Sequence, residues 1–218
     1  MIDRGILYVV WGDTIEASLE RSIASVRRVY PNIPIRVERL DGSGLGQKAS
    51  MADLSPFRST LYLDADTVVM GNLDFAFEKA EQFGLACCIC EAPWMARYGD
   101  AEGIEYNTGV LFFTSGARRV FDNWKARVSE SAKSTWTMVD GIPRGLSFDD
   151  QAGFARAIAA CEFNPFILPI NYNQRPYFHR SLFLPLKIWH DYGPVPESLI
   201  EMNGACERGE RPITYYLL

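Results

Sequence analysis

The alternation of apolar and polar residues at the start of the chain predicts a strand, a helix and a second strand. Residues 5–11 form a β-branched and aromatic run, typical of a strand buried on both faces. A helix should follow, opened by Asp13 and Glu16 as an acidic capping box and ended by Pro31. Its apolar positions recur at helical spacing, at Ile15, Leu19, Ile23, Val26 and Tyr30. With a strand at residues 33–40, this unit predicts a right-handed parallel crossover.

The rest of the chain continues the alternation of strands and helices. We expect a short helix at residues 48–54 and later helices at 115–128 and 149–160. The further predicted strands are residues 59–64, 83–89, 108–113, 166–168 and 186–189. There is no repeat, low-complexity tract or linker, so we expect one α/β domain over residues 1–218, with a mixed, mostly parallel sheet flanked by helices.

Composition and charge narrow the class of protein. The 218 residues are 48% hydrophobic and 22% charged, with a net charge of -5, which is ordinary for a folded soluble chain. No basic stripe is present, so nucleic acid is not an expected partner. The N-terminal run is a poor signal peptide, and no segment reaches the ~18 apolar residues of a membrane span. We therefore expect a cytoplasmic protein, with its oligomeric state left open.

The five cysteines favour reduced core thiols over a disulfide framework. Their number is odd, and Cys87, Cys88 and Cys90 lie together in an apolar run. A zinc site built from these three with Cys161 or Cys206 is a weaker alternative, because the spacing is far from paired CxxC motifs.

Two aspartates stand one residue apart at the end of the strand predicted at residues 59–64. If the chain stays extended through Ala65, the side chains of Asp64 and Asp66 point the same way and converge. Two such carboxylates repel each other unless a cation lies between them, and Mg²⁺ or Mn²⁺ takes oxygen ligands of this kind. The alternative is a solvated turn in which each aspartate caps a backbone N–H. The apolar residues on both sides favour the metal site, because buried unpaired charge is costly.

Five segments in a fixed order resemble nucleotide-sugar glycosyltransferases. These are Lys48 ahead of the strand, "LYLDADTVVMGNLD", "EYNTGVLFFTSG", "DDQAGFARAI" and "IWHDYG". Together they resemble the retaining glycogenin-like and galactinol-synthase-like enzymes of glycosyltransferase family 8, which have the GT-A fold. A single DxD motif is common in proteins, whereas five segments in this order and spacing are far more specific.

The resemblance implies a set of site residues. Asp64, Asp66 and His190 would ligate Mn²⁺ or Mg²⁺ together with the donor diphosphate. Asn107 and Thr108 would contact the donor sugar, Lys48 its phosphate or sugar, and Ala65, between the two metal ligands, would also bind the donor. Asp150 and Gln151 would be the catalytic pair that faces the sugar. Structural explanations remain open for each: a core histidine at 190, a polar strand start at 107, a helix N-terminus at 150 and a surface lysine at 48.

Two departures from the family pattern stand out. The family has a lysine after its late H-x-x-G, where this chain has Pro196 and Glu197, so Lys187, Arg208 or Arg211 would have to replace it. The family also has an aromatic residue early in the first helix that stacks on the base. Here Thr14 and Ile15 occupy that place, and Trp11 is the candidate substitute.

The resemblance implies transfer of a hexose from a nucleoside diphosphate sugar, with uridine as the expected base, to a sugar, glycan or small-molecule acceptor, with retention of configuration. One rival is a haloacid-dehalogenase-type phosphatase with Asp64 as nucleophile, Asp66 as general acid, and Thr114, Lys125, Asp149 and Asp150 in support. Against it, about sixty residues precede a strand that normally opens such a domain. The other rivals are a non-catalytic nucleotide-sugar binder and a sugar nucleotidylyltransferase, but the glycine-rich loop of the latter is missing after the first strand.

Overall fold

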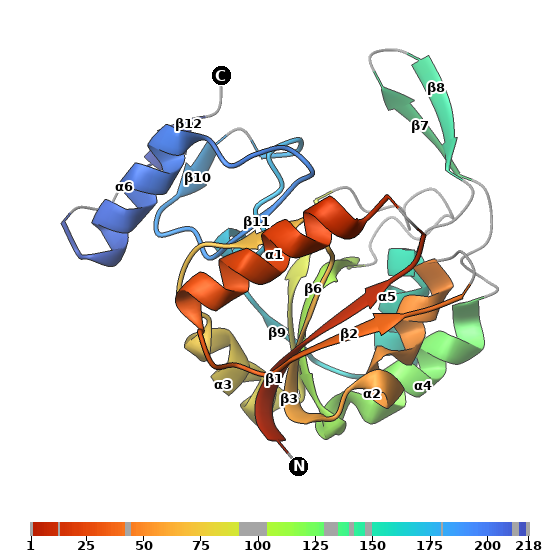
Figure 1. The fold of residues 1–218 in the computed structure, drawn as a ribbon. Coiled ribbons are helices and arrows are strands. Elements are labelled where there is room, and N and C mark those ends of the chain that lie inside the picture. The colour runs from red at the N-terminus through yellow and green to blue at the C-terminus, as the bar shows by residue number, and fades with distance from the viewer. Residues whose placement is uncertain are drawn as a thin grey trace.

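The protein is described here by a computed structural model that covers residues 2–12, 14–41, 45–91, 104–128, 135–139, 142–146, 150–179, 181–210 and 214–216. A six-stranded sheet forms its centre, in the order β2-β1-β3-β6-β5-β9 (Figure 1). The strands are β1 (Ile2–Val10), β2 (Ile35–Arg39), β3 (Phe57–Leu63), β5 (Leu85–Ile89), β6 (Tyr106–Thr114) and β9 (Phe166–Ile167). The pairs β1–β2, β1–β3 and β5–β9 are parallel, whereas β6 is antiparallel to both of its neighbours. The predicted mixed, mostly parallel α/β sheet is confirmed.

Helices cover both faces of this sheet (Figure 1). On one face lie α1 (Glu16–Val29) and α3 (Asp74–Phe83); on the other lie α4 (Arg118–Arg127), α5 (Asp150–Ala160), α2 (Met51–Leu54) and the 3-10 helix η1 (Leu45–Ser50). Successive side chains of β1 point to opposite faces of the sheet, because side chains alternate along a strand. Tyr8 packs in the core with Leu19 and Phe77, and its neighbour Leu7 packs in the core with Trp124. The central strands are therefore buried on both sides, as their apolar runs predicted.

The C-terminal part of the chain returns to the sheet beside the two aspartates. Strand β11 (Ile188–His190) pairs antiparallel with β4 (Thr67–Val69), which directly follows Asp66. Beyond this pair lie β10 (Ser181–Phe183), β12 (Thr214–Tyr216) and α6 (Glu197–Glu207), with a small apolar core that includes Trp189 (Figure 1). The strands β7 (Thr135–Val139) and β8 (Ile142–Leu146) form a hairpin, and η3 (Ser115–Ala117) and η5 (Ile170–Tyr172) are short 3-10 turns.

The predicted capping box at the start of the first helix is wrong. Helix α1 begins at Glu16, and its N-cap Ile15 makes no side-chain cap, so Glu16 lies in the first turn instead of closing a capping box. The Glu16 carboxylate contacts Arg39 of β2 instead. Asp13, the other predicted member of the box, lies outside the described residues.

None of the helices in the described ranges has the length and hydropathy needed to cross a membrane.

Candidate metal and nucleotide site

Asp64 and Asp66 lie in a tight turn at the carboxyl end of β3. The prediction that the chain stays extended through Ala65 is wrong: the backbone N–H of Thr67 donates to the carbonyl of Asp64 at 3.2 Å, and the Thr67 hydroxyl donates to the same oxygen at 2.7 Å. The N–H of Asp64 in turn donates to the carbonyl of Gly109 in β6 at 2.8 Å. The turn therefore brings the two carboxylates to one side of the strand end through hydrogen bonding.

His190 reaches this turn through the pairing of β11 with β4. The register sets His190 opposite Thr67, one residue after Asp66. The His190 Nε2 atom lies 3.3 Å from Asp66 Oδ1 and 3.9 Å from Asp64 Oδ2. One ligand atom from each of the three side chains lies within 4.8 Å of the others, the only such group of three or more among the residues that the structure describes. The three residues named as metal ligands from the sequence thus form a cluster.

The orientation of the imidazole is set by a buried asparagine. Asn173 Oδ1 lies 2.8 Å from His190 Nδ1, and an amide oxygen can only accept, so Nδ1 donates this hydrogen bond while Nε2 faces the aspartates. Asn173 is fully buried. Metal-ligating histidines are commonly oriented in this way by a hydrogen bond to the second ring nitrogen.

The donor set fits a divalent cation that accepts oxygen and imidazole ligands, such as Mn²⁺ or Mg²⁺. Room for it depends on Gly109: a Cβ there would lie 2.3 Å from His190 Cε1 and 2.7 Å from Asp64 Oδ2. Burial alone would raise the pKa of Asp66, but interaction with His190 outweighs it and holds that pKa below its usual value. Asp66 is therefore held as a carboxylate, the form that binds cations.

Lys48 joins the metal-site aspartate to the predicted catalytic aspartate. Its Nζ atom lies 2.8 Å and 2.9 Å from the two Asp64 oxygens and 3.4 Å from Asp150 Oδ2. Burial opposes the charge, but the attraction of Asp150 and Asp64 prevails and the pKa of Lys48 is raised. The Tyr62 hydroxyl donates to Asp64 Oδ1 at 2.7 Å, and burial together with Asp64 raises the pKa of that phenol. The surface-lysine explanation for Lys48 is wrong, because its side chain is only 5% exposed.

The other residues predicted to face the sugar lie next to this network. Thr108 donates to Asp150 Oδ2 at 2.6 Å, and Asn107 Oδ1 accepts from the Gly109 N–H at 2.9 Å. Asp150 and Gln151 are the first two residues of α5. Asp150 is 6% exposed, so it is a buried carboxylate supported by Thr108 and Lys48. The contacts of Asn107, Thr108, Asp150 and Gln151 with a sugar stay predictions.

A cavity of about 270 Å³ opens beside the two aspartates. Its lining includes five residues predicted from the sequence to bind metal or donor, namely Trp11, Lys48, Asp64, Ala65 and Asp66. Thr14 and Ile15 also line it, so the place where the family has its aromatic residue does face the cavity.

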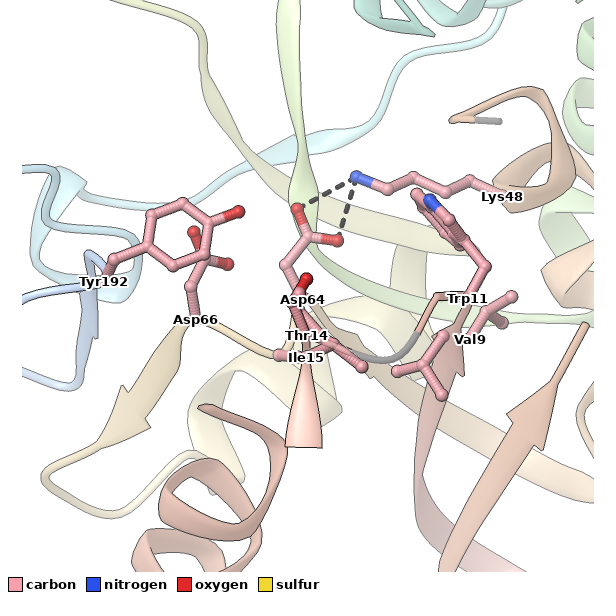
Figure 2. A pocket seen from close by; sticks show the side chains of 10 residues that line it. Val9, Trp11, Thr14, Ile15, Lys48, Asp64, Asp66 and Tyr192 are labelled. Carbon is pink, nitrogen blue, oxygen red and sulfur yellow. Dashed lines mark hydrogen bonds and ion pairs between the residues drawn. The ribbon is translucent and has the colours of Figure 1, made fainter. Parts of the chain in front are cut away.

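Figure 2 shows Trp11 on one side of this cavity and Tyr192 on the other, beside Asp66. Asp64 lies between them, with its carboxylate hydrogen-bonded to Lys48. Tyr192, which is 71% exposed, was not predicted from the sequence, and neither were Tyr62, Gly109 and Asn173. Tyr192 lies two residues after His190, and its place in "IWHDYG" was the one clue that pointed to it.

The residues considered as replacements for the missing lysine do not line this cavity in the described structure. Lys187 Nζ pairs with Glu207 at 2.5 Å, and Arg208 pairs with Glu210 at 2.5 Å. Arg211 lies outside the described residues. Lys48 is therefore the positively charged side chain among the described residues that line the cavity.

An arginine on α1 fixes the segment that follows His190. The Arg21 guanidinium donates to three consecutive carbonyls, those of Asp191 at 2.7 Å, Tyr192 at 2.8 Å and Gly193 at 2.9 Å. The N–H of Asp191 donates to the carbonyl of Asp66 at 3.0 Å. The segment that carries Tyr192 is thus fastened both to the first helix and to the turn that holds the aspartates.

The cysteines take no part in the metal cluster. Cys87, Cys88, Cys90 and Cys161 are buried and form no disulfide, and burial raises the pKa of Cys88. Neutral thiols are poor metal ligands, so the described structure favours the reading of core cysteines over the zinc alternative.

No family model and no curated protein matches the chain. Among solved structures, the chain is similar to LgtC (TM-score 0.59, 15% identity, 92% of this chain and 95% of that one). It is also similar to the glycosyltransferase GlyE of Streptococcus pneumoniae TIGR4 (0.58, 16%, 89% and 55%) and to mouse xyloside xylosyltransferase 1 (0.56, 13%, 89% and 100%). The chain has a glycosyltransferase fold.

This glycosyltransferase fold confirms the predicted GT-A class. The chain spans only about half of the GlyE chain, 55%, but nearly all of LgtC. LgtC, a galactosyltransferase, has also been solved in complex with donor and acceptor sugar analogs. In this fold the metal cluster and the cavity lie at the carboxyl ends of the parallel strands β1 and β3, where α/β sheets bind ligands.

Proposed function

We propose that this protein is a metal-dependent glycosyltransferase that moves a hexose from a nucleoside diphosphate sugar, with uridine as the base, to an acceptor. The observation that carries the proposal is the convergence of Asp64, Asp66 and His190 within 4.8 Å, with both aspartates lining the cavity. The resemblance to glycosyltransferase family 8 adds retention of configuration and the roles of the residues around the cluster.

In this proposal Asp64, Asp66 and His190 hold Mn²⁺ or Mg²⁺. The bound cation supplies Lewis-acid stabilisation of the negative charge on the departing nucleoside diphosphate. Asn173 keeps Nε2 of His190 directed at the cluster. Trp11, Thr14 and Ile15 form the wall of the cavity that takes the base, with Trp11 as the stacking surface.

The reacting sugar lies in this proposal near Asp150, Gln151, Asn107 and Thr108. Thr108 donates to Asp150 Oδ2, and Lys48 Nζ lies 3.4 Å from the same oxygen, so the carboxylate is held in place. A fixed carboxylate beside the sugar stabilises positive charge that develops at the anomeric carbon when the glycosidic bond breaks. Asn107 and Gln151 supply neutral amides for sugar hydroxyls.

The structure disfavours the phosphatase alternative. In the register of β3 and β6, Thr114 is opposite Ser59 at the start of β3, whereas Asp64 follows its end. Lys125 lies on α4, where it pairs with Asp53 at 2.6 Å and Asp122 at 3.2 Å. Thr114 and Lys125, the residues that the phosphatase reading assigned to support Asp64, are therefore not beside it.

The test is hydrolysis of a panel of nucleoside diphosphate sugars with Mn²⁺, followed by transfer to candidate acceptors. Asp66→Asn should lower turnover by about 100-fold or more and remove Mn²⁺-dependent UDP binding, because it takes charge from a ligand and little volume from the core. Asp122→Asn, on the surface of α4, is the matched control and should behave as wild type.

Each alternative has its own outcome in this test. Nucleotide binding without turnover of any donor would favour a non-catalytic binder. Hydrolysis of an aryl phosphate that Asp64→Asn abolishes would establish the phosphatase instead.

A further inference from the structure

The buried lysine at the metal cluster occupies the same carboxylate that a cation would use. Lys48 extends from η1 over the ring of Tyr62, with Nζ 5.8 Å from the ring centroid, and contacts both Asp64 oxygens (Figure 2). The Asp64 oxygen nearest His190 is Oδ2, and Lys48 Nζ lies 2.9 Å from it. An ion held by Asp64, Asp66 and His190 must therefore compete with the ammonium group for Asp64.

A second acceptor for the lysine is already in place. Asp150 Oδ2 lies 3.4 Å from Nζ, so a small movement of the Lys48 side chain transfers its hydrogen bond from Asp64 to Asp150. Asp64, Asp66, Asp150 and Lys48 together carry two negative charges in excess, which is the charge that one divalent cation neutralises. Binding of that cation still places it next to a like charge at low exposure, which lowers the affinity.

We propose that Lys48 is an internal counter-ion that keeps cation binding weak until a diphosphate is present, so that cation and nucleotide bind cooperatively. The inference rests on the proposed metal site. Diphosphate oxygens add negative charge beside the cluster, share the cation, and offer Nζ a further acceptor when it leaves Asp64. By linkage, the factor by which UDP strengthens Mn²⁺ binding equals the factor by which Mn²⁺ strengthens UDP binding.

The experiment measures the Mn²⁺ dissociation constant by electron paramagnetic resonance, with and without UDP, in wild type and variants of the full chain. Lys48→Met should bind Mn²⁺ about 10-fold or more tightly than wild type without UDP, and UDP should strengthen its binding much less. Lys48→Arg keeps the charge and should keep weak binding without UDP. Lys125→Met is the matched control, because Lys125 also lies between two aspartates but on the surface of α4.

The Lys48→Met variant leaves the Asp64 and Asp150 carboxylates without their shared partner and could fail to fold for that reason. Lys48→Gln is therefore the second variant, because the glutamine amide still donates to one carboxylate. Tighter Mn²⁺ binding in either neutral variant, even where wild type shows none without UDP, supports the proposal. Equal or weaker binding in a folded neutral variant, with wild type binding Mn²⁺ normally, overturns the role of Lys48 and leaves the proposed function standing. Absence of Mn²⁺ binding in every protein, with UDP or without, overturns both.

Discussion

One glycine in β6 leaves the space in which two of the three candidate metal ligands approach each other. Gly109 accepts the backbone hydrogen bond of Asp64, and its missing side chain leaves the space where Asp64 Oδ2 and His190 Cε1 approach each other. A methyl group there would overlap both, and neither can retreat freely, because Lys48 holds Asp64 and Asn173 holds His190. The geometry of the cluster of Asp64, Asp66 and His190 therefore depends on the absence of a Cβ atom at residue 109.

Gly109→Ala should lower Mn²⁺ affinity by about 10-fold or more, because the displaced ligands lose their common centre, in the range typical of changes beside metal ligands. Overpacking should also cost about 1–3 kcal/mol of the free energy of unfolding. Calorimetric Mn²⁺ titration with UDP present and urea denaturation measure the two effects. Gly204→Ala on α6 is the control, since the nearest atom to its Cβ would be the end of the flexible Arg208 side chain at 3.3 Å. Unchanged Mn²⁺ affinity in Gly109→Ala would show that the ion binds elsewhere.

At the scale of elements, the site is a junction between the end of β3 and the segment around β11. Neither contains a complete cluster: the turn after β3 supplies Asp64 and Asp66, and β11 supplies His190. Helix α1 controls the next residues of the segment through Arg21, whose planar fork suits three adjacent carbonyl oxygens. Tyr192 faces the cavity from this fastened position.

Arg21→Ala should weaken UDP binding in the presence of Mn²⁺ by about 5-fold to 30-fold, on the scale of one or two kcal/mol for lost charge-assisted hydrogen bonds. The metal ligands themselves stay in place through β11, so Mn²⁺ affinity without UDP should change much less. Fluorescence or calorimetric titration separates the two constants, and Arg21→Lys should recover part of the loss. Arg28→Ala, exposed on the same helix, should bind UDP as wild type does; an equal loss in both variants would point to a general charge effect.

At the scale of the whole molecule, distant parts of the chain share one ligand site. The sheet and η1 supply Trp11, Lys48 and the aspartates, while the C-terminal part supplies His190 and Tyr192. A bound cation and nucleotide would contact both parts and neither would bind the unfolded chain, so ligand binding must raise the stability of the fold.

UDP with Mn²⁺ at about 100 times the dissociation constant should therefore raise the midpoint of thermal unfolding by about 5–10 °C, since it adds about 2.7 kcal/mol. UDP alone or Mn²⁺ alone should raise the midpoint less, and removal of Mn²⁺ by a chelator should reverse the increase that Mn²⁺ gives. Differential scanning fluorimetry measures the shift, with Asp66→Asn as the variant in which the Mn²⁺-dependent part should vanish. A full shift in that variant would mean that Asp66 does not ligate the ion.

Local patterns were sufficient for the regular parts of the fold. The apolar runs predicted β1, β3 and β6 because strands buried on both faces need nearly continuous apolar residues. They did not predict α3, β4, α6 or the strands β7, β8, β10 and β12, which are short or less strongly patterned. The capping box failed because the N-cap is Ile15, so Glu16 is the first helical residue instead of the third, which a box opened by Asp13 would require.

By itself, the sequence determined that two aspartates stand at the end of a buried strand, that His190 and Asp150 follow in a glycosyltransferase-like order, and that the sheet is mostly parallel. The first and last of these features follow from apolar periodicity along the chain, whereas the order of Asp150 and His190 comes from the resemblance to glycosyltransferase family 8. Only the tertiary structure decided that the aspartates meet through a turn, that Lys48 is buried between Asp64 and Asp150, and that Tyr192 faces the cavity. Those outcomes depend on strand register and on charges that approach through space, and no local pattern records either.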